Sequence, residues 1–119
     1  MTAGFLEMSR FTRWVTEELS DEEYVELQKL LAERPYAGAL IPGCGGVRKL
    51  RFAVGGQNKG KRGGARIIYY YVEEPSLFLM IAGYNKNVTA DLSPEAKRLA
   101  VQLTREFKAE YARRGESSQ

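Results

Sequence analysis

The hydrophobic period changes once along this chain, from a helical repeat to strict alternation, and the change falls at Val47. Before Val47, apolar residues at i, i+3 and i+4 predict a helix near Phe11 and a second helix that runs from Ser20 to about Glu33. Ser20 and Glu23 have the spacing of a capping box, which fixes the start of the second helix. The N-terminal part is therefore predicted to be helical.

Alternating and β-branched segments follow in close succession. Residues 47–54, 65–72 and 77–84 are rich in apolar and aromatic side chains, and the residues 73–76, "EEPS", suit a short turn between the last two. We expect three antiparallel strands here. Residues 5–8 form a further, short candidate strand before the first helix.

A final helix is predicted to begin at Ser93, with Pro94 at its first position. Its expected apolar face comprises Ala96, Leu99, Ala100, Leu103 and Phe107. At 119 residues the chain has room for one domain, residues 1–119. The predicted class is α+β: an antiparallel β-sheet packed on two N-terminal helices plus a C-terminal helix, with the helices on one face and the cations on the other.

The charge is unevenly distributed, although the net charge is only +3. Eight acidic residues lie between Glu7 and Glu33, and none lies between Glu33 and Glu73. Seven cations fall between Arg48 and Arg66 in that second stretch, among glycines and aromatic residues. This pattern favours a positive surface that binds a polyanion such as nucleic acid, and the alternative is an ordinary solvated surface.

Several function classes are disfavoured by composition. The chain has no histidine and one cysteine, Cys44, so an internal disulfide is impossible and a conventional zinc site has too few ligands. We expect Cys44 to be a small buried or loop residue, since a thiolate nucleophile would lack a histidine base. No apolar run is long enough to cross a membrane and no secretory signal is apparent, so a cytoplasmic protein without metal, cofactor or membrane contact is expected.

The glycine-rich stretch before residue 65 partly matches a nucleotide-binding P-loop. Gly55, Gly60 and Lys61 have the right spacing. Arg62, however, stands where a hydroxyl should hold magnesium, and a strand pattern follows in place of a helix. We therefore predict a hairpin loop whose glycines allow close approach to a ligand and whose cations contact phosphates.

Together, four motifs make the chain resemble a known family. "GCGGVRKLRF", "KGKRGGARIIYYYV", "YNKN" and "DLSPEAKRL" look like the pattern of the HigB-like branch of the RelE/ParE superfamily of bacterial toxins. The stretch "LSDEEYVELQKLLAERPYAG" is similar to the paired helices and following turn of that family. The resemblance spans nearly the whole chain.

This resemblance implies the toxin of a type II toxin–antitoxin system, with a compact RelE-like domain. Such a toxin is a metal-independent endoribonuclease that cleaves mRNA in the ribosomal A site by attack of a 2′-hydroxyl on the adjacent phosphate. A cognate antitoxin, of the helix-turn-helix HigA-like kind, is the implied partner. The alternative is a non-catalytic RNA- or ribosome-binding module, while a DNA-binding regulator is disfavoured because the cations lie on strands and not on a recognition helix.

The resemblance and the charge pattern together select the candidate site residues. Lys49 is expected to be the general base, because a lysine crowded by other cations gives up its proton more readily. Arg66 would clamp the scissile phosphate, and Lys86 would protonate the leaving oxygen. The full catalytic set is Lys49, Arg51, Arg66, Lys86 and Tyr84. The residues expected to hold RNA are Arg48, Lys59, Lys61, Arg62 and Tyr69.

Simpler interpretations exist for several of these residues. Tyrosines in a strand usually pack in the core or on the sheet, Arg66 could pair with Glu73 or Glu74, and Lys86 could be a plain loop residue. The chain also departs from the family pattern at two positions. Asn87 and Val88 stand where relatives carry an arginine or a glutamate. If those residues carry protons in the relatives, catalysis here is expected to be slower or differently arranged.

Overall fold

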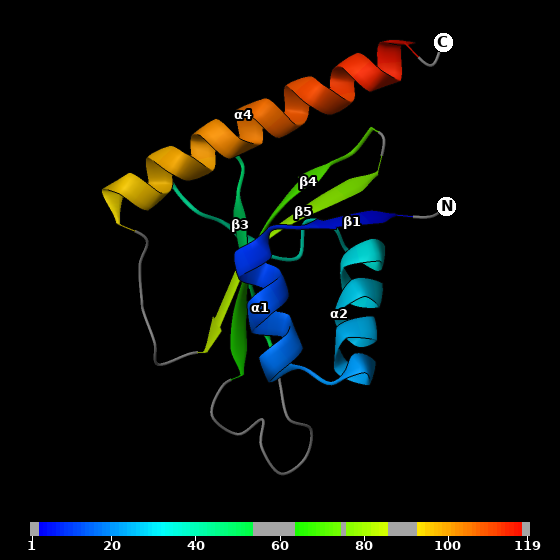
Figure 1. Cartoon of the computed structure of the whole chain (residues 1–119), viewed down its shortest axis with the longest axis vertical. Coiled ribbons are helices and arrows are strands. Elements are labelled where there is room, and N and C mark those ends of the chain that lie inside the picture. Colours follow the sequence, from blue (N-terminus) through cyan, green and yellow to red (C-terminus); the bar gives the residue numbers. More distant parts are fainter. Residues whose placement is uncertain (1–2, 54–63, 75, 86–92, 118–119) are drawn as a thin grey trace.

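The computed structural model describes residues 3–53, 64–74, 76–85 and 93–117, with side chains as far as Tyr111. One five-stranded sheet has the order β1-β5-β4-β3-β2 (Figure 1). Its strands are β1 (Gly4–Glu7), β2 (Ala39–Leu40), β3 (Arg48–Phe52), β4 (Ala65–Val72) and β5 (Leu77–Asn85). The α+β class is thus confirmed, but the sheet is mixed, because β1 runs parallel to β5 while the other neighbours are antiparallel.

The described residues form three helices beside the sheet: α1 (Ser9–Glu18), α2 (Asp21–Glu33) and α4 (Pro94–Ser117). The predicted capping box of α2 is present, since the Glu23 backbone N–H donates to the Ser20 hydroxyl and the Ser20 N–H donates to the Glu23 carboxylate. Ser93 caps α4 by accepting from the backbone N–H of Ala96 at 3.1 Å. Local sequence therefore sets where these two helices begin.

The main core lies between α1, α2 and one face of the sheet. Phe11 and Val15 of α1 and Leu27 and Leu31 of α2 are buried there against alternate residues of the strands. Those strand residues are Leu50, Phe52, Ile67, Tyr69, Phe78 and Met80. The alternation predicted for residues 47–54 is confirmed, because Leu50 and Phe52 point inward.

The opposite face of the sheet is also covered, which corrects the expectation that the helices occupy one face only. Cys44, Val47, Ile68 and Ala100 form a second buried cluster, so α4 packs on the face away from α1 and α2 (Figure 1). The second layer follows from neighbouring residues of β4, since Ile67 faces the main core and Ile68 faces this cluster. Burial of Cys44 agrees with its predicted structural role.

The packing face of α4 agrees with the predicted one except at Leu99. Ala100 is buried as expected, but Leu99 is 55% exposed and Thr104, which was not predicted, is 4% exposed. The hydroxyl of Thr104 donates to the Val101 carbonyl at 2.9 Å, which satisfies it inside the interface. Ala96, Leu103 and Phe107 are half-buried as predicted, and the Phe107 ring packs edge-on against Tyr70. The most buried stripe runs through residues 97, 100, 101 and 104, and of the predicted face only Leu99 is exposed. Within the described part of the chain, no helix is long and apolar enough to cross a membrane.

Candidate nucleic-acid interface

Three of the predicted catalytic residues form one row across the sheet. Arg51 of β3 lies directly opposite Arg66 of β4, and Arg66 lies directly opposite Tyr84 of β5. Directly opposed residues place their Cβ atoms about 5 Å apart, so the three side chains are neighbours. Lys49 lies two residues before Arg51 and therefore on the same face, opposite Ile68. The structure brings these four predicted residues together.

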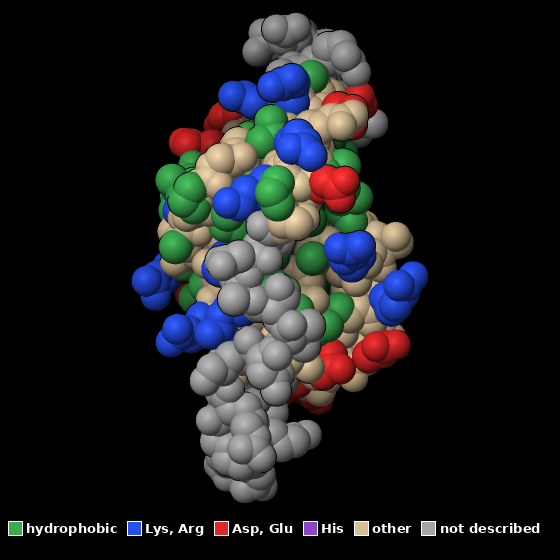
Figure 2. Space-filling model, turned by 90° about the vertical axis from the view of Figure 1, so that its left-hand side faces the viewer, with side chains coloured by type: hydrophobic (Ala, Val, Ile, Leu, Met, Phe, Trp, Pro, Cys, Tyr) green, Lys and Arg blue, Asp and Glu red, His purple; other side chains and the backbone are tan. Residues whose placement is uncertain are grey.

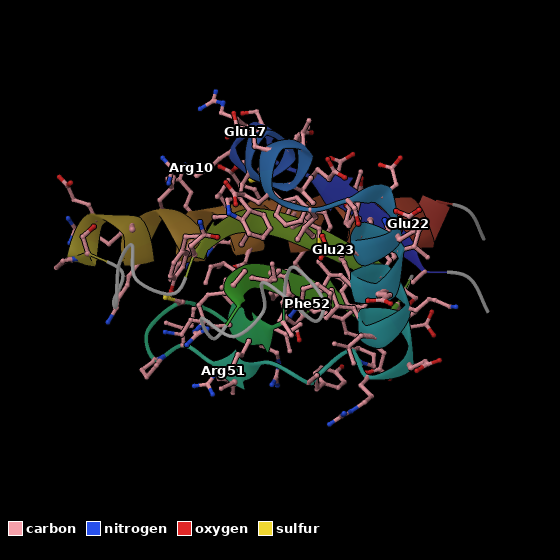
Figure 3. The ribbon with its side chains drawn as sticks, turned by 90° about the horizontal axis from the view of Figure 1, so that it is seen from below. Arg10, Glu17, Glu22, Glu23, Arg51 and Phe52 are labelled. Atoms are coloured by element: carbon pink, nitrogen blue, oxygen red, sulfur yellow. The ribbon has the colours of Figure 1, made fainter. Side chains whose placement is uncertain are left out.

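The strand pleat separates this surface from the core. Figure 3 shows Phe52 in the interior beside α2 and its neighbour Arg51 at the outer margin, on the side away from α1. Arg51 is exposed, whereas Lys49, Arg66 and Tyr84 are half-buried. Two guanidinium groups directly opposite each other repel, which is costly for folding but offers two donor forks to one bound anion.

A pocket of about 300 Å³ adjoins this row. Lys49, Tyr84 and Ile68 line it from the sheet, and Lys97 lines it from α4. The remaining wall is the segment 39–42, with the side chains of Leu40, Ile41 and Pro42. The pocket thus combines an apolar wall with amine and hydroxyl donors, which is the usual composition of a small-ligand site.

Arg48 does not join this cluster. It shares the sheet face of Leu50 and Phe52, and its guanidinium donates to the carbonyl oxygens of Gly38 at 2.7 Å and Tyr36 at 3.3 Å. The same group lies 4.9 Å from the centre of the Tyr36 ring. These contacts give Arg48 a structural role in holding the segment after α2 against β3. Its side chain points to the face of the sheet opposite that of Lys49.

Tyr69 is fully buried in the main core, so it has no exposed ring face on which a base could stack. Its hydroxyl donates to the Pro35 carbonyl at 2.8 Å and accepts from the backbone N–H of Gly38 at 3.0 Å. Burial raises the pKa of Tyr69 above its ordinary value. The simpler interpretation of the tyrosines, as packing residues, is the one that the geometry supports for Tyr69, and we leave it out of the site.

Four predicted residues lie outside the described part of the chain: Lys59, Lys61, Arg62 and Lys86. The same holds for Asn87 and Val88. Their roles stay predictions. For Arg66, the alternative pairing with Glu73 or Glu74 is excluded, because Arg66 begins β4 and those acids follow its far end, roughly 20 Å away at about 3.3 Å per residue. Glu73 instead accepts from the Tyr36 hydroxyl.

The surface around the start of α4 mixes basic and hydrophobic side chains. Figure 2 shows this side of the molecule, with Lys and Arg side chains lying among hydrophobic ones, and with Asp and Glu also present. Among the described residues, no group of three or more Asp, Glu or Cys side chains is placed to hold a metal ion. Hydrogen-bond donors dominate the described site, and donors of this kind bind phosphate groups.

Comparison with solved structures identifies the architecture. A double arginine-to-alanine mutant of E. coli toxin RelE, in the free state, matches with a TM-score of 0.53 and 19% sequence identity. The match covers 86% of this chain and 97% of the RelE chain. The chain has a RelE-like fold. A scan of known protein families finds no family model that matches the chain.

The structure adds Lys97 and the segment 39–42 to the residues that sequence reasoning selected. Lys97 lines the pocket although the predicted apolar face of the last helix passed through Leu99 and Leu103. A second stripe at residues 97, 100, 101 and 104 has the same helical spacing and was available in the sequence. No sequence pattern marked the segment 39–42 as part of the pocket. It lines the pocket only because the edge of the sheet lies near α4, which is a property of the tertiary structure.

Proposed function

We propose that this protein is the toxin of a type II toxin–antitoxin system, a HigB-like endoribonuclease that cleaves mRNA at the ribosome. One observation carries the proposal: Lys49, Arg51, Arg66 and Tyr84, which the family resemblance selects, lie together on one face of a RelE-like sheet. The resemblance spans motifs along most of the chain, and the similarity to RelE extends over most of both chains.

The proposed reaction uses the substrate's own nucleophile. Lys49 takes the proton from a ribose 2′-hydroxyl, the 2′-oxygen forms a bond to the adjacent phosphorus, and the bond from phosphorus to the 5′-oxygen breaks. Arg51 and Arg66 donate to the phosphoryl oxygens, on which negative charge develops in the transition state. The products are a 2′,3′-cyclic phosphate and a 5′-hydroxyl end, so no water is consumed in this step.

The proposal also assigns roles to residues outside the described ranges and to an antitoxin protein. Lys86 would return a proton to the 5′-oxygen, while Lys59, Lys61 and Arg62 would hold RNA. Tyr84 would donate to the phosphate or stack on a base. A helix-turn-helix HigA-like antitoxin would neutralise the toxin by covering Lys49, Arg51 and Arg66 with an acidic or helical segment.

Conditional expression in bacteria tests the proposal. We expect growth arrest, rescue by the neighbouring open reading frame, and new RNA ends inside coding regions that carry 5′-hydroxyl groups. The variants Lys49→Ala and Arg66→Ala should abolish most of these ends at equal protein level. Lys29→Ala is the matched control, because Lys29 is an exposed lysine of α2 on the far side of the sheet.

The possible outcomes separate the competing functions. Arrest without new ends would indicate the non-catalytic RNA- or ribosome-binding module, for which Asn87 and Val88 are the sequence argument. Neither arrest nor new ends in the absence of the neighbouring gene product would refute both. If new RNA ends persist in cells that express Arg66→Ala, the proposed site is wrong although the protein is still a nuclease.

A further inference from the structure

Lys97 lies at the rim of the buried face of α4. It precedes Ala100 and Thr104 on one stripe of the helix, and those two residues are 5% and 4% exposed against the sheet and the segment 41–47. Lys97 itself is half-buried. A lysine at such a rim packs its methylene stem and keeps its ammonium group at the edge, so what matters is the surface that this group borders.

The pocket explains the position. Lys97 and Lys49 line the same cavity of about 300 Å³ from two different layers, α4 and the sheet. Among the described residues that line the cavity, none is acidic. Lys97 therefore offers its charge to a ligand with no lining carboxylate to compete, so an anion in the cavity is attracted. The cavity is thus better suited to an anionic ligand than to a neutral one.

The walls of the cavity restrict the ligand further. Ala39, Leu40, Ile41, Pro42 and Ile68 supply apolar surface, and Tyr84 supplies a ring and a hydroxyl. A volume of about 300 Å³ is at the lower end of the range for small-molecule sites, roughly 300–1,000 Å³. A ligand that fits must therefore be small, partly apolar and anionic. A single nucleotide of an RNA strand has these properties, with a flat base and a phosphate.

We propose that this cavity is a nucleotide subsite beside the scissile phosphate and that Lys97 is its phosphate-binding residue. The proposal rests on the proposed function, which supplies RNA as the ligand. The apolar wall receives the base or sugar of one nucleotide. Lys97 contacts a phosphate from α4, while Lys49, the proposed general base, faces the 2′-hydroxyl from the sheet. In this arrangement α4 contributes to substrate binding and does not only cover the sheet.

Binding of a non-cleavable RNA tests Lys97 directly. The probe is a fluorescently labelled single-stranded RNA hexamer that carries 2′-O-methyl groups, which remove the nucleophile. We expect Lys97→Gln to weaken binding about tenfold, the size of a lost charge-assisted hydrogen bond. Lys97→Arg keeps the charge and should remain within about threefold of the wild type. Thermal unfolding of each variant shows whether the fold is intact.

Lys108→Gln is the matched control, because Lys108 is an exposed lysine of the same helix and its replacement removes the same charge. It should leave hexamer affinity and RNA cleavage in cells near wild-type values. The same variants are scored for new RNA ends in cells. The inference is overturned if Lys97→Gln equals Lys108→Gln in every assay in which the wild type is active. A wild type that neither binds nor cleaves RNA overturns the proposed function itself.

Discussion

Arg66 lies between Arg51 and Tyr84 in one row of side chains, so its planar donor fork is placed to contact a phosphate held over the sheet. We expect Arg66→Ala to lower the single-turnover rate of mRNA cleavage on programmed ribosomes by about 10²–10³-fold, the usual cost of losing one transition-state donor. Arg66→Lys should recover only part of the rate, since an ammonium group cannot bind two phosphoryl oxygens in the same fork.

The stability of both Arg66 variants is the control for this experiment. Arg66 is half-buried at the start of β4, and its removal also relieves repulsion with Arg51. Melting temperatures close to that of the wild type would attribute the rate loss to chemistry. An alanine variant that cleaves at the wild-type rate would show that Arg66 has no part in the reaction.

Tyr69 has the opposite role, because its hydroxyl bridges Pro35 and Gly38 inside the core. Tyr69→Phe leaves the buried Gly38 N–H and the Pro35 carbonyl without this partner, so we expect a loss of about 1–3 kcal/mol in the free energy of unfolding. Denaturant unfolding measures it. Tyr36→Phe is the matched control, since Tyr36 is 53% exposed and its loss should cost under about 0.5 kcal/mol.

Sequence reasoning at the residue scale succeeded where alternation alone decides the answer. The pleat of β3 put Lys49 and Arg51 on one face, as predicted, because successive side chains of a strand must point to opposite sides. It could not assign Tyr69, whose neighbours Tyr70 and Tyr71 have equal propensity for strands. Burial of Tyr69 depends on the segment after α2. The backbone of that segment provides hydrogen-bond partners for the Tyr69 hydroxyl, and these make burial of this tyrosine favourable.

At the scale of elements, α1 and β5 meet at a glycine. A methyl group added at Gly83 would collide with the indole ring of Trp14. We therefore expect Gly83→Ala to destabilise the protein by about 1–3 kcal/mol, the usual cost of overpacking, measured by denaturant unfolding. Gly4→Ala is the control, because its added methyl meets only the flexible end of Leu77, which can rotate away. Equal stability of the two variants would refute the tight contact between α1 and β5.

The elements were largely predictable, and the antiparallel pairing of β3, β4 and β5 is confirmed, whereas the place of β1 in the sheet was not predicted. The capping box of α2 and the turn between β4 and β5 are local sequence signals. Helix α2 and strand β4 therefore begin and end close to the residues predicted from the sequence. Parallel pairing of β1 with β5 is not a local property, since residues far apart in the chain determine it. The most buried stripe of α4 was ambiguous for the same reason: two stripes have helical spacing, and only contact with the segment 41–47 selects one.

At the scale of the whole molecule, the two faces of the sheet carry different charges. The acid-rich helix α2 covers one face together with α1, whose two arginines balance its two glutamates. Lys49, Arg51 and Arg66 lie on the other face, where Lys49 shares a pocket with Lys97. This separation turns a modest net charge of +3 into a local positive field. A polyanion approaching the sheet is therefore attracted to one side, which orients RNA before any specific contact forms.

Salt dependence provides a test of that orientation. The logarithm of RNA affinity should fall linearly with the logarithm of salt concentration, with a slope of about −0.7 for each phosphate contact to single-stranded RNA. Arg51→Gln should therefore reduce the slope by about 0.7, because Arg51 is exposed on the binding face. Lys29→Gln removes the same charge from α2, on the far side of the sheet, and should leave the slope unchanged. The slopes of both variants are measured by binding titrations with the 2′-O-methyl hexamer at salt concentrations between roughly 50 and 200 mM. Equal slopes for the two variants would mean that RNA responds to net charge alone and that the basic face of the sheet is not where it binds.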